Sequence, residues 1–110
     1  MEITETVLNS ATVLALTGRL DGLASPGLEH KIDILLAAGV RTLVLDCARL
    51  DYVSSAGLRI FLTTAKKLKT AGGRAAFASL TPTVREIFEL SGFLAVLDVQ
   101  PTAAVAAGTN

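Results

Sequence analysis

The sequence predicts an α/β fold in which a mixed, mostly parallel β-sheet is flanked by about four α-helices. Two observations lead to this class. Runs of β-branched and aliphatic residues alternate along the chain with segments whose apolar residues recur at helical spacing. Proline and glycine separate these segments at positions that suit helix starts and ends. Strands that alternate with helices in this way imply parallel pairing through right-handed crossovers.

A β-hairpin is expected at the start of the chain. Glu2 to Leu8 and Thr12 to Leu20 are rich in Thr, Val, Leu and Ile, which favour extended strands. Asn9 and Ser10 lie between these two runs and are typical turn residues, so the strands should pair as neighbours.

The first helix is expected to begin at Ser25 and to end before Gly39. Ser25 suits the N-cap, Pro26 suits the first helical position, and Gly39 suits the left-handed residue after a helix. One face of this helix is apolar at i, i+4, i+7 and i+8: Leu28, Ile32, Leu35 and Leu36. His30 falls on the polar side, where we expect it to be solvated rather than to bind a ligand.

A buried central strand is expected over Thr42 to Asp46, because this short run is almost wholly apolar. The segment from Cys47 to Val53 is expected to form a loop. Cys47 itself is interpreted as a small buried hydrophobic residue. Tyr52 either contacts a partner or covers the edge of the core, and the sequence favours neither role.

The second helix is expected to start at Ser54 or Ser55 and to reach about Ala71, before a Gly-Gly pair. Its apolar stripe is formed by Leu58, Phe61, Leu62, Ala65 and Leu68. Another face carries basic residues, either as a solvated surface or as a contact for an acidic partner, and solvation is the simpler role: Arg59, Lys66, Lys67 and Lys69.

The alternation continues in the second half of the chain. Arg74 to Ser79 is a strand candidate, Thr81 and Pro82 open a third helix, and Gly92 ends that helix. The residues expected to face inward from it are Val84, Ile87, Phe88 and Leu90. The four phenylalanines are expected in or near the core: Phe61, Phe77, Phe88 and Phe93.

Leu94 to Val99 is expected to form the last strand, and Pro101 to Ala107 a short helix. Residues 108 to 110 are expected to fray, as chain ends commonly do. Residues 1–110 then form one domain, with its core over about 2–99 and a short terminal helix and tail over 100–110.

Composition excludes several classes of function. The chain has 110 residues, 51% of them hydrophobic, and its ten basic side chains balance ten acidic ones. Disordered chains are poorer in aliphatic residues, and nucleic-acid binders usually carry a basic excess. One histidine and one cysteine provide neither a set of zinc ligands nor a disulfide framework. We therefore expect no metal, no cofactor and no nucleic-acid partner.

The sequence also argues against membrane insertion. No apolar run approaches the roughly 20 residues that a membrane-spanning helix needs. The amino end, MEITETVLNS, has two acids and no basic segment, unlike a signal peptide. A cytoplasmic protein is expected.

Ser54 and Ser55 lie where a site is expected. In open α/β sheets, ligands bind beyond the carboxyl ends of strands, and a helix N-terminus favours an anion. A phosphate on either hydroxyl would be tolerated there, and Ala56 and Gly57 leave the helix start open to another protein. Helix capping by one serine and tight packing of Gly57 explain the same residues without any site.

Four short segments, taken in order, match a known family. GRLD closes the second strand, VSSAGLRIFL opens the second helix, KKLKTAGG ends it, and TPTVREIFELSGF forms the third helix. With these motifs, from about Glu2 to Val99, the chain resembles the STAS domain of anti-sigma factor antagonists. The resemblance implies a single STAS-like domain that binds other proteins and is not an enzyme.

The resemblance also implies the site. The family motif Asp-Ser-small-Gly-Leu carries the serine that a partner kinase phosphorylates. Aligned on the Gly-Leu pair, Ser55 is the phosphoacceptor, and Ser54 replaces the Asp and becomes the second choice. Asp21 matches an acidic residue that faces the partner, although composition alone makes it a turn aspartate. The implied partner-binding residues are Asp21, Ser54, Ser55, Ala56, Gly57 and Leu58.

The implied mechanism is a partner switch. With a free Ser55 hydroxyl, the domain would bind an anti-sigma factor serine/threonine kinase and so release the sigma factor. Phosphorylation adds about −1.5 to −2 charges at pH 7, which would weaken a complementary interface. A PP2C-type phosphatase would reset the switch, and the domain would be a monomer that forms heterocomplexes.

Two alternatives stay open. A STAS module without the switch would bind its partner whatever the state of Ser55, for example as an accessory subunit of a lipid-transport or signalling complex, and the replacement at Ser54 favours this reading. A small α/β enzyme is disfavoured, because one histidine and one cysteine supply few nucleophile–base pairs and the sequence has no Gly-rich phosphate loop.

Overall fold

Two antiparallel strands form the first part of the structure, a computed structural model that describes residues 1–108. β1 (Glu2–Leu8) pairs with β2 (Ala11–Leu20), which confirms the predicted hairpin. Asn9 and Ser10 connect the strands with positive φ angles of 50° and 68°. Positive φ at both central residues is typical of a type I′ turn, whose twist matches that of the flanking strands.

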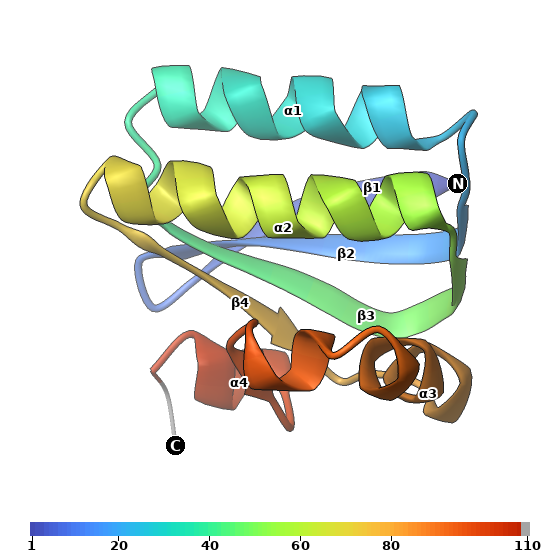
Figure 1. Cartoon of the computed structure of the whole chain (residues 1–110). Coiled ribbons are helices and arrows are strands. Elements are labelled where there is room, and N and C mark those ends of the chain that lie inside the picture. Colours follow the sequence, from blue (N-terminus) through green and yellow to red (C-terminus); the bar gives the residue numbers. More distant parts are fainter. Residues whose placement is uncertain (109–110) are drawn as a thin grey trace.

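Within the described residues, β2 continues into a five-stranded sheet with the order β1-β2-β3-β4-β5 (Figure 1). β3 (Thr42–Val53), β4 (Arg74–Ala78) and β5 (Val99–Gln100) follow, and each pair from β2 onward is parallel. The predicted mixed, mostly parallel sheet is confirmed. Because β2 and β3 are parallel neighbours, their carboxyl ends lie at the same edge of the sheet.

β3 is longer than predicted, and the loop predicted over Cys47 to Val53 is wrong. The second half of β3 pairs with the second half of β2, as far as Leu20 opposite Val53. Register shifts interrupt this pairing, and the buried residues Cys47, Leu50 and Val53 recur at every third position rather than every second. This spacing hides the strand from a search for alternating apolar residues.

Four helices in the described part of the chain cover the sheet unequally (Figure 1). α1 (Ser25–Ala37) and α2 (Ser55–Thr70) lie side by side on one face, and α4 (Ala103–Ala106) lies on the other. α3 (Pro82–Leu90) packs against β3. Between α4 and the sheet lies a small second core: Ala11, Val13, Val44, Ala76, Ala78, Ala106 and Ala107. No helix within residues 1–108 is long and apolar enough to span a bilayer.

An aromatic cluster fixes α2 to its neighbours in the main core. The ring centre of Phe61 in α2 lies 4.8 Å from that of Phe77 in β4 and 6.0 Å from that of Phe88 in α3. All three rings are fully buried, and Phe93 adds a further contact, 6.2 Å from Phe88. Such ring pairs stabilise a fold beyond their buried area. The core placement predicted for the phenylalanines is confirmed, and it sets the position of α2.

The last third of the chain departs from prediction at two places. The strand predicted over Leu94 to Val99 is wrong, because Phe93–Ala95 form a 3₁₀ turn, η1, and only Val99–Gln100 pair with β4. Leu90 was predicted to face inward but is 83% exposed, because it is the last residue of α3 and lies beyond the buried face of that helix.

The helix ends agree better with prediction. Gly39 and Gly72 follow α1 and α2 in the left-handed region, with φ of 99° and 82°. The short helix predicted over Pro101 to Ala107 is confirmed as α4. The tail predicted to fray starts at Gly108, and residues 109–110 lie outside the described residues.

Candidate functional site

The carboxyl ends of β2 and β3 are tied together at one edge of the sheet. Leu20 pairs with Val53, and the N–H of Ser54 donates to the carbonyl of Leu20 with 2.9 Å between nitrogen and oxygen. The connections from β2 to α1 and from β3 to α2 lie at the same side of the molecule in Figure 1. The residues after each strand therefore share one surface, which we call the strand-end surface: Asp21 to Ala24 and Ser54 to Leu58.

The two serines on this surface differ in role. Ser54 is the N-cap of α2, because its backbone is extended and its Oγ accepts a hydrogen bond from the N–H of Gly57 at 3.2 Å. Ser55 is the first residue of the helix, and its side chain is exposed. The hydroxyl of Ser55 thus stands at the positive end of the helix dipole, open to solvent.

Gly57 is buried against the end of β2, and only a residue without a side chain fits there. A Cβ atom at this position would lie 2.8 Å from both the carbonyl oxygen and the Cγ of Leu20, and 2.9 Å from the Cγ1 of Val53. The close contact holds the first turn of α2 against the strand ends. The neighbours Ala56 and Leu58 are half-buried, and Leu58 packs on the main core.

Asp21 shapes the loop from β2 into α1. Its Oδ1 accepts hydrogen bonds from the N–H of Ala24 at 3.0 Å and of Leu23 at 3.1 Å. These bonds, led by the one from Ala24, favour the charged carboxylate and lower the pKa of Asp21. The predicted N-cap at Ser25 is wrong, because Asp21 satisfies the N–H groups before α1. The Ser25 hydroxyl is buried instead and donates to the carbonyl of Asp21 at 2.7 Å.

The sequence does not single out Leu23 at this edge, and it leaves the role of Tyr52 undecided. Leu23 is 93% exposed, and no periodic pattern in the sequence distinguishes a single leucine in a loop. The Arg19 guanidinium lies 4.4 Å from the ring centre of Tyr52, in a cation–π contact. Tyr52 therefore has a partner within the domain, on the lengthened β3.

The remaining chemically active side chains match their predicted environments. His30 is exposed on α1. Cys47 is fully buried in β3, where burial, helped by the charge of Asp46, raises the pKa of its thiol well above the usual range. Among residues 1–108, no group of three His, Cys, Asp or Glu side chains is placed to hold a metal ion. The strand-end surface can offer a hydroxyl for modification and a face for another protein.

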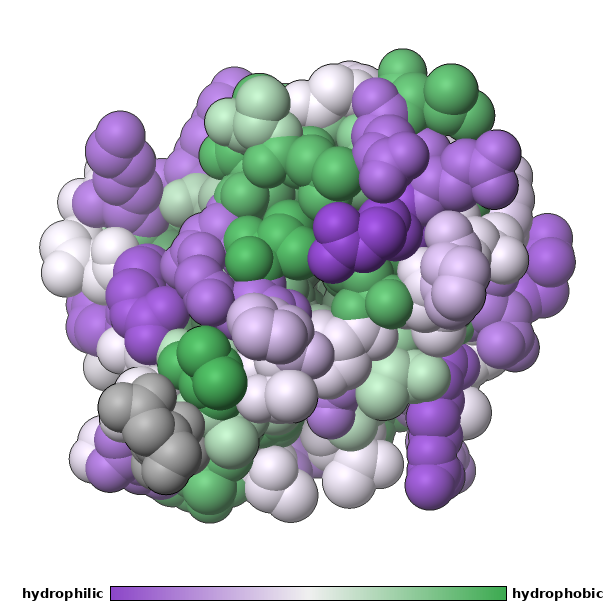
Figure 2. Space-filling model, turned by 90° about the horizontal axis from the view of Figure 1, so that it is seen from below, coloured by the Kyte–Doolittle hydropathy of each residue, from purple (hydrophilic) through white to green (hydrophobic). Residues whose placement is uncertain are grey.

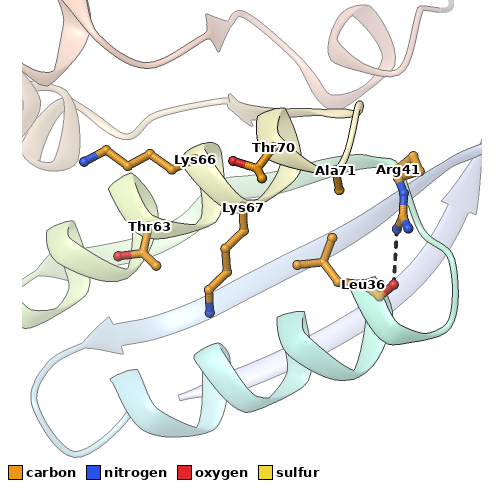
Figure 3. Close-up of a pocket in the computed structure, with 7 residues that line it drawn as sticks. All are labelled: Leu36, Arg41, Thr63, Lys66, Lys67, Thr70 and Ala71. Atoms are coloured by element: carbon orange, nitrogen blue, oxygen red, sulfur yellow. Dashed lines mark hydrogen bonds between the residues drawn. The ribbon is translucent and has the colours of Figure 1, made fainter.

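A hollow of about 430 Å³ lies far from this surface, between the last turns of α1 and α2 (Figure 3). Arg41 at its rim donates to the carbonyl of Leu36 at 3.1 Å, and Lys67 lies 2.8 Å from a carboxylate oxygen of Asp33. Lys67 in α2 thereby joins α2 to α1, whereas Arg41 bonds to the end of α1. On the α2 side the lining residues run from Thr63 to Ala71, about 12 to 24 Å along the helix axis from Ser55.

The chain matches the STAS domain family over residues 2–106. It belongs to this family. A Bordetella bronchiseptica protein, BtrV, is 38% identical over 99 residues, which make up 90% of this STAS domain and 85% of BtrV. BtrV is named as an anti-sigma factor antagonist, so the family that the sequence motifs indicated is confirmed.

Solved structures share the fold of this STAS domain. The anti-sigma factor antagonist SpoIIAA in its unphosphorylated form matches with a TM-score of 0.80 at 26% identity, over 96% of this chain and 92% of SpoIIAA. Phosphorylated SpoIIAA of Bacillus matches with a TM-score of 0.74 at 25% identity, over 97% of each chain. A relative with this fold has therefore been solved with and without a phosphate.

Proposed function

We propose that this STAS domain is an anti-sigma factor antagonist that binds an anti-sigma factor serine kinase and leaves it when Ser55 is phosphorylated. The observation that carries the proposal is the exposed Ser55 hydroxyl on the first turn of α2, on the surface shared with the Asp21 loop. The Ser54 hydroxyl is bonded to the helix, so Ser55 is the accessible acceptor of the pair.

Relatives support this chemistry. BtrV and SpoIIAA are both named as anti-sigma factor antagonists, and the two SpoIIAA structures represent an unmodified and a phosphorylated state. A phosphate is thus compatible with the fold that this chain adopts.

The serine at position 54, where the family motif has aspartate, fits a structural role. Serine and aspartate are both preferred N-caps, because an oxygen of either side chain accepts the N–H groups of the first helical turn. Ser54 makes such a bond with Gly57. The replacement therefore keeps the start of α2, and with it the position of Ser55.

Phosphorylation of Ser55 should disturb a docked partner more than the domain itself. The first turn of a helix favours an anion, so the folded domain tolerates the added charge. The same edge carries the carboxylates of Asp51, which is exposed, and of Asp21. About −1.5 to −2 further charges beside these carboxylates would have to be desolvated in an interface, and they would repel acidic groups there.

The proposal is tested by incubating the domain with the anti-sigma factor serine kinases of its own organism and Mg·ATP. Mass spectrometry should find one phosphoryl group on the unchanged domain and on Ser54→Ala, and none on Ser55→Ala. Modification that persists in Ser55→Ala and disappears in Ser54→Ala would move the acceptor to Ser54. No modification of the unchanged domain by any of these kinases, each shown to be active, would contradict the proposal.

The remaining parts of the cycle belong to the same proposal. A PP2C-type phosphatase would restore the Ser55 hydroxyl, and the exchange would take place in the cytoplasm between a monomeric domain and its partners. A domain without the switch would bind the kinase equally well as Ser55→Ala and as Ser55→Glu, and this comparison separates the two readings.

A further inference from the structure

Leu23 is the most exposed large apolar side chain in the described part of the chain, at 93%. Single exposed leucines are common on protein surfaces and need no explanation by themselves. Leu23 differs in two respects, namely how firmly its backbone is held and what lies beside it.

The backbone of Leu23 is fixed by Asp21. The Oδ1 atom of Asp21 accepts the N–H of Leu23 at 3.1 Å and that of Ala24 at 3.0 Å, and the Asp21 carbonyl accepts the N–H of Ser25 at 2.9 Å. The loop is thereby joined to the first turn of α1. Because the backbone of this loop is already ordered, a partner that covers Leu23 does not have to order the loop as well.

Leu23 belongs to the strand-end surface that carries Ser55. Leu20, three residues before Leu23, accepts the N–H of Ser54, one residue before Ser55. Gly57 brings the first turn of α2 into contact with the same Leu20. A protein that reaches the Ser55 hydroxyl therefore meets the Asp21–Ala24 loop at the same edge (Figure 1).

A hollow lies beside Leu23 at this edge. It has a volume of about 410 Å³ and is lined by Met1, Arg19, Asp21, Leu23 and Ala24. Met1 is itself 43% exposed, so two apolar side chains, Met1 and Leu23, flank the recess. Its lining also includes the charged side chains of Arg19 and Asp21. An apolar centre with polar groups around it is the usual anatomy of a protein–protein interface.

We infer that Leu23 is an apolar anchor for the kinase that docks on Ser55, and that Asp21 is the positioning residue that holds it. The inference rests on the proposed function, since the occupant of the surface is the partner named there. Asp21 then acts through its hydrogen bonds to the loop, and Leu23 makes the contact with the kinase.

Other apolar patches of the domain have no such link to a partner. Leu90 and Val96, for example, are 83% and 65% exposed near the end of α3, and the face of the molecule seen from below shows apolar side chains among polar ones (Figure 2). Neither residue belongs to the strand-end surface, so they are not part of this inference.

The test measures the Kd of the full domain for the purified kinase that phosphorylates it in the assay above. Leu23→Ser is expected to raise the Kd about 10- to 100-fold, the loss that follows from leaving one leucine uncovered. Val7→Ser is the matched control, because Val7 is 72% exposed but lies near the hairpin turn, at the opposite edge of the sheet. It should bind like the unchanged domain.

The positioning role of Asp21 is tested with two variants. Asp21→Asn keeps an oxygen that accepts the same backbone N–H groups and should bind nearly normally, whereas Asp21→Ala should weaken binding about as much as Leu23→Ser. Equal losses in both Asp21 variants would show that its charge contacts the kinase and would overturn this role.

A labelled variant checks burial of position 23 directly. Leu23→Cys can be labelled selectively with an environment-sensitive fluorophore, because the native Cys47 thiol is fully buried. The kinase should shift its emission, and should leave a Val7→Cys label unchanged. Normal affinity of Leu23→Ser with no emission shift would overturn the anchor but leave the proposed function intact. Failure of the unchanged domain to bind any of the kinases would overturn both.

Discussion

Ser54 and Ser55 are adjacent, yet the backbone gives their hydroxyls different surroundings. The Ser54 N–H is taken by the Leu20 carbonyl, and its Oγ turns to the N–H of Gly57. Ser55 is left facing solvent as the first helical residue. The sequence predicts that one of the two caps the helix but not which, because the answer depends on how β2 and β3 pair. Leu23 is harder still to predict, since its exposure follows from the bonds of Asp21.

Gly57→Ala is expected to lower the free energy of unfolding by about 1–3 kcal/mol, because the new methyl group has to push apart α2 and the end of β2. A Cβ at this position would lie 2.8 Å from the carbonyl oxygen of Leu20. Urea denaturation followed by circular dichroism measures the change. Gly27→Ala is the control, because a Cβ at Gly27 in α1 meets no atom within 4 Å. Equal losses in the two variants would contradict the packing role of Gly57.

Asp21 should make the free energy of unfolding of the domain depend on pH at acidic pH. Its pKa is lower in the folded state, mainly through the N–H of Ala24, so its stabilising effect is present above about pH 4. The effect is lost as the pH falls through the folded-state pKa. Asp21→Asn should therefore lose less stability than the unchanged domain between pH 7 and pH 3, as measured by urea midpoints. Parallel losses in the two proteins would contradict this prediction.

At the scale of elements, the types of helix and strand follow from the sequence better than their ends. α2 is predicted well, because its apolar stripe, its capping serine and the Gly-Gly pair are all local signals. β3 and β5 are predicted poorly, because their ends depend on partner strands. The second half of β3 exists through its irregular register with β2, and β5 is limited to the two residues that pair with β4.

The extended β3 can be checked through its cysteine. Cys47 is fully buried and burial raises the pKa of its thiol, so a maleimide should not modify the folded domain within hours. The same reagent should label Cys47 rapidly in concentrated urea. Leu23→Cys serves as the exposed control and should react at once in the folded state. Rapid labelling of Cys47 without denaturant would mean that β3 is open beyond Asp46, as in the loop first predicted.

At the scale of the whole molecule, the core fixes the position of α2 and the strand-end surface exposes its first turn. The aromatic cluster of Phe61, Phe77 and Phe88 anchors α2 from within, and the exposed first turn of that helix carries Ser55. The chain has no formal net charge, so one phosphate would make the whole domain anionic. Its effect should appear in partner binding and not in folding.

Ser55→Glu is expected to leave the free energy of unfolding within about 0.5 kcal/mol of the unchanged domain, because a carboxylate suits the first turn of a helix. Under the proposed function, the same variant should bind the kinase at least about tenfold more weakly, since the added charge must be desolvated at the interface. Denaturation and titration calorimetry measure the two quantities on one sample. Ser55→Gln is the neutral control of similar size. A large loss of stability in Ser55→Glu alone would mean that the phosphate acts by unfolding α2.

The positions of Met1 and Gly108 have a practical consequence for such experiments. Met1 lines the recess beside Leu23, whereas Gly108 lies next to the hairpin turn, where the Asn9 amide donates to the carbonyl of Ala107 at 3.1 Å. An affinity tag, reporter fusion or surface linker attached before Met1 would crowd the strand-end surface. The same attachment after the last residue would leave that surface clear, so immobilisation through the carboxyl end is the suitable geometry for capturing the partner.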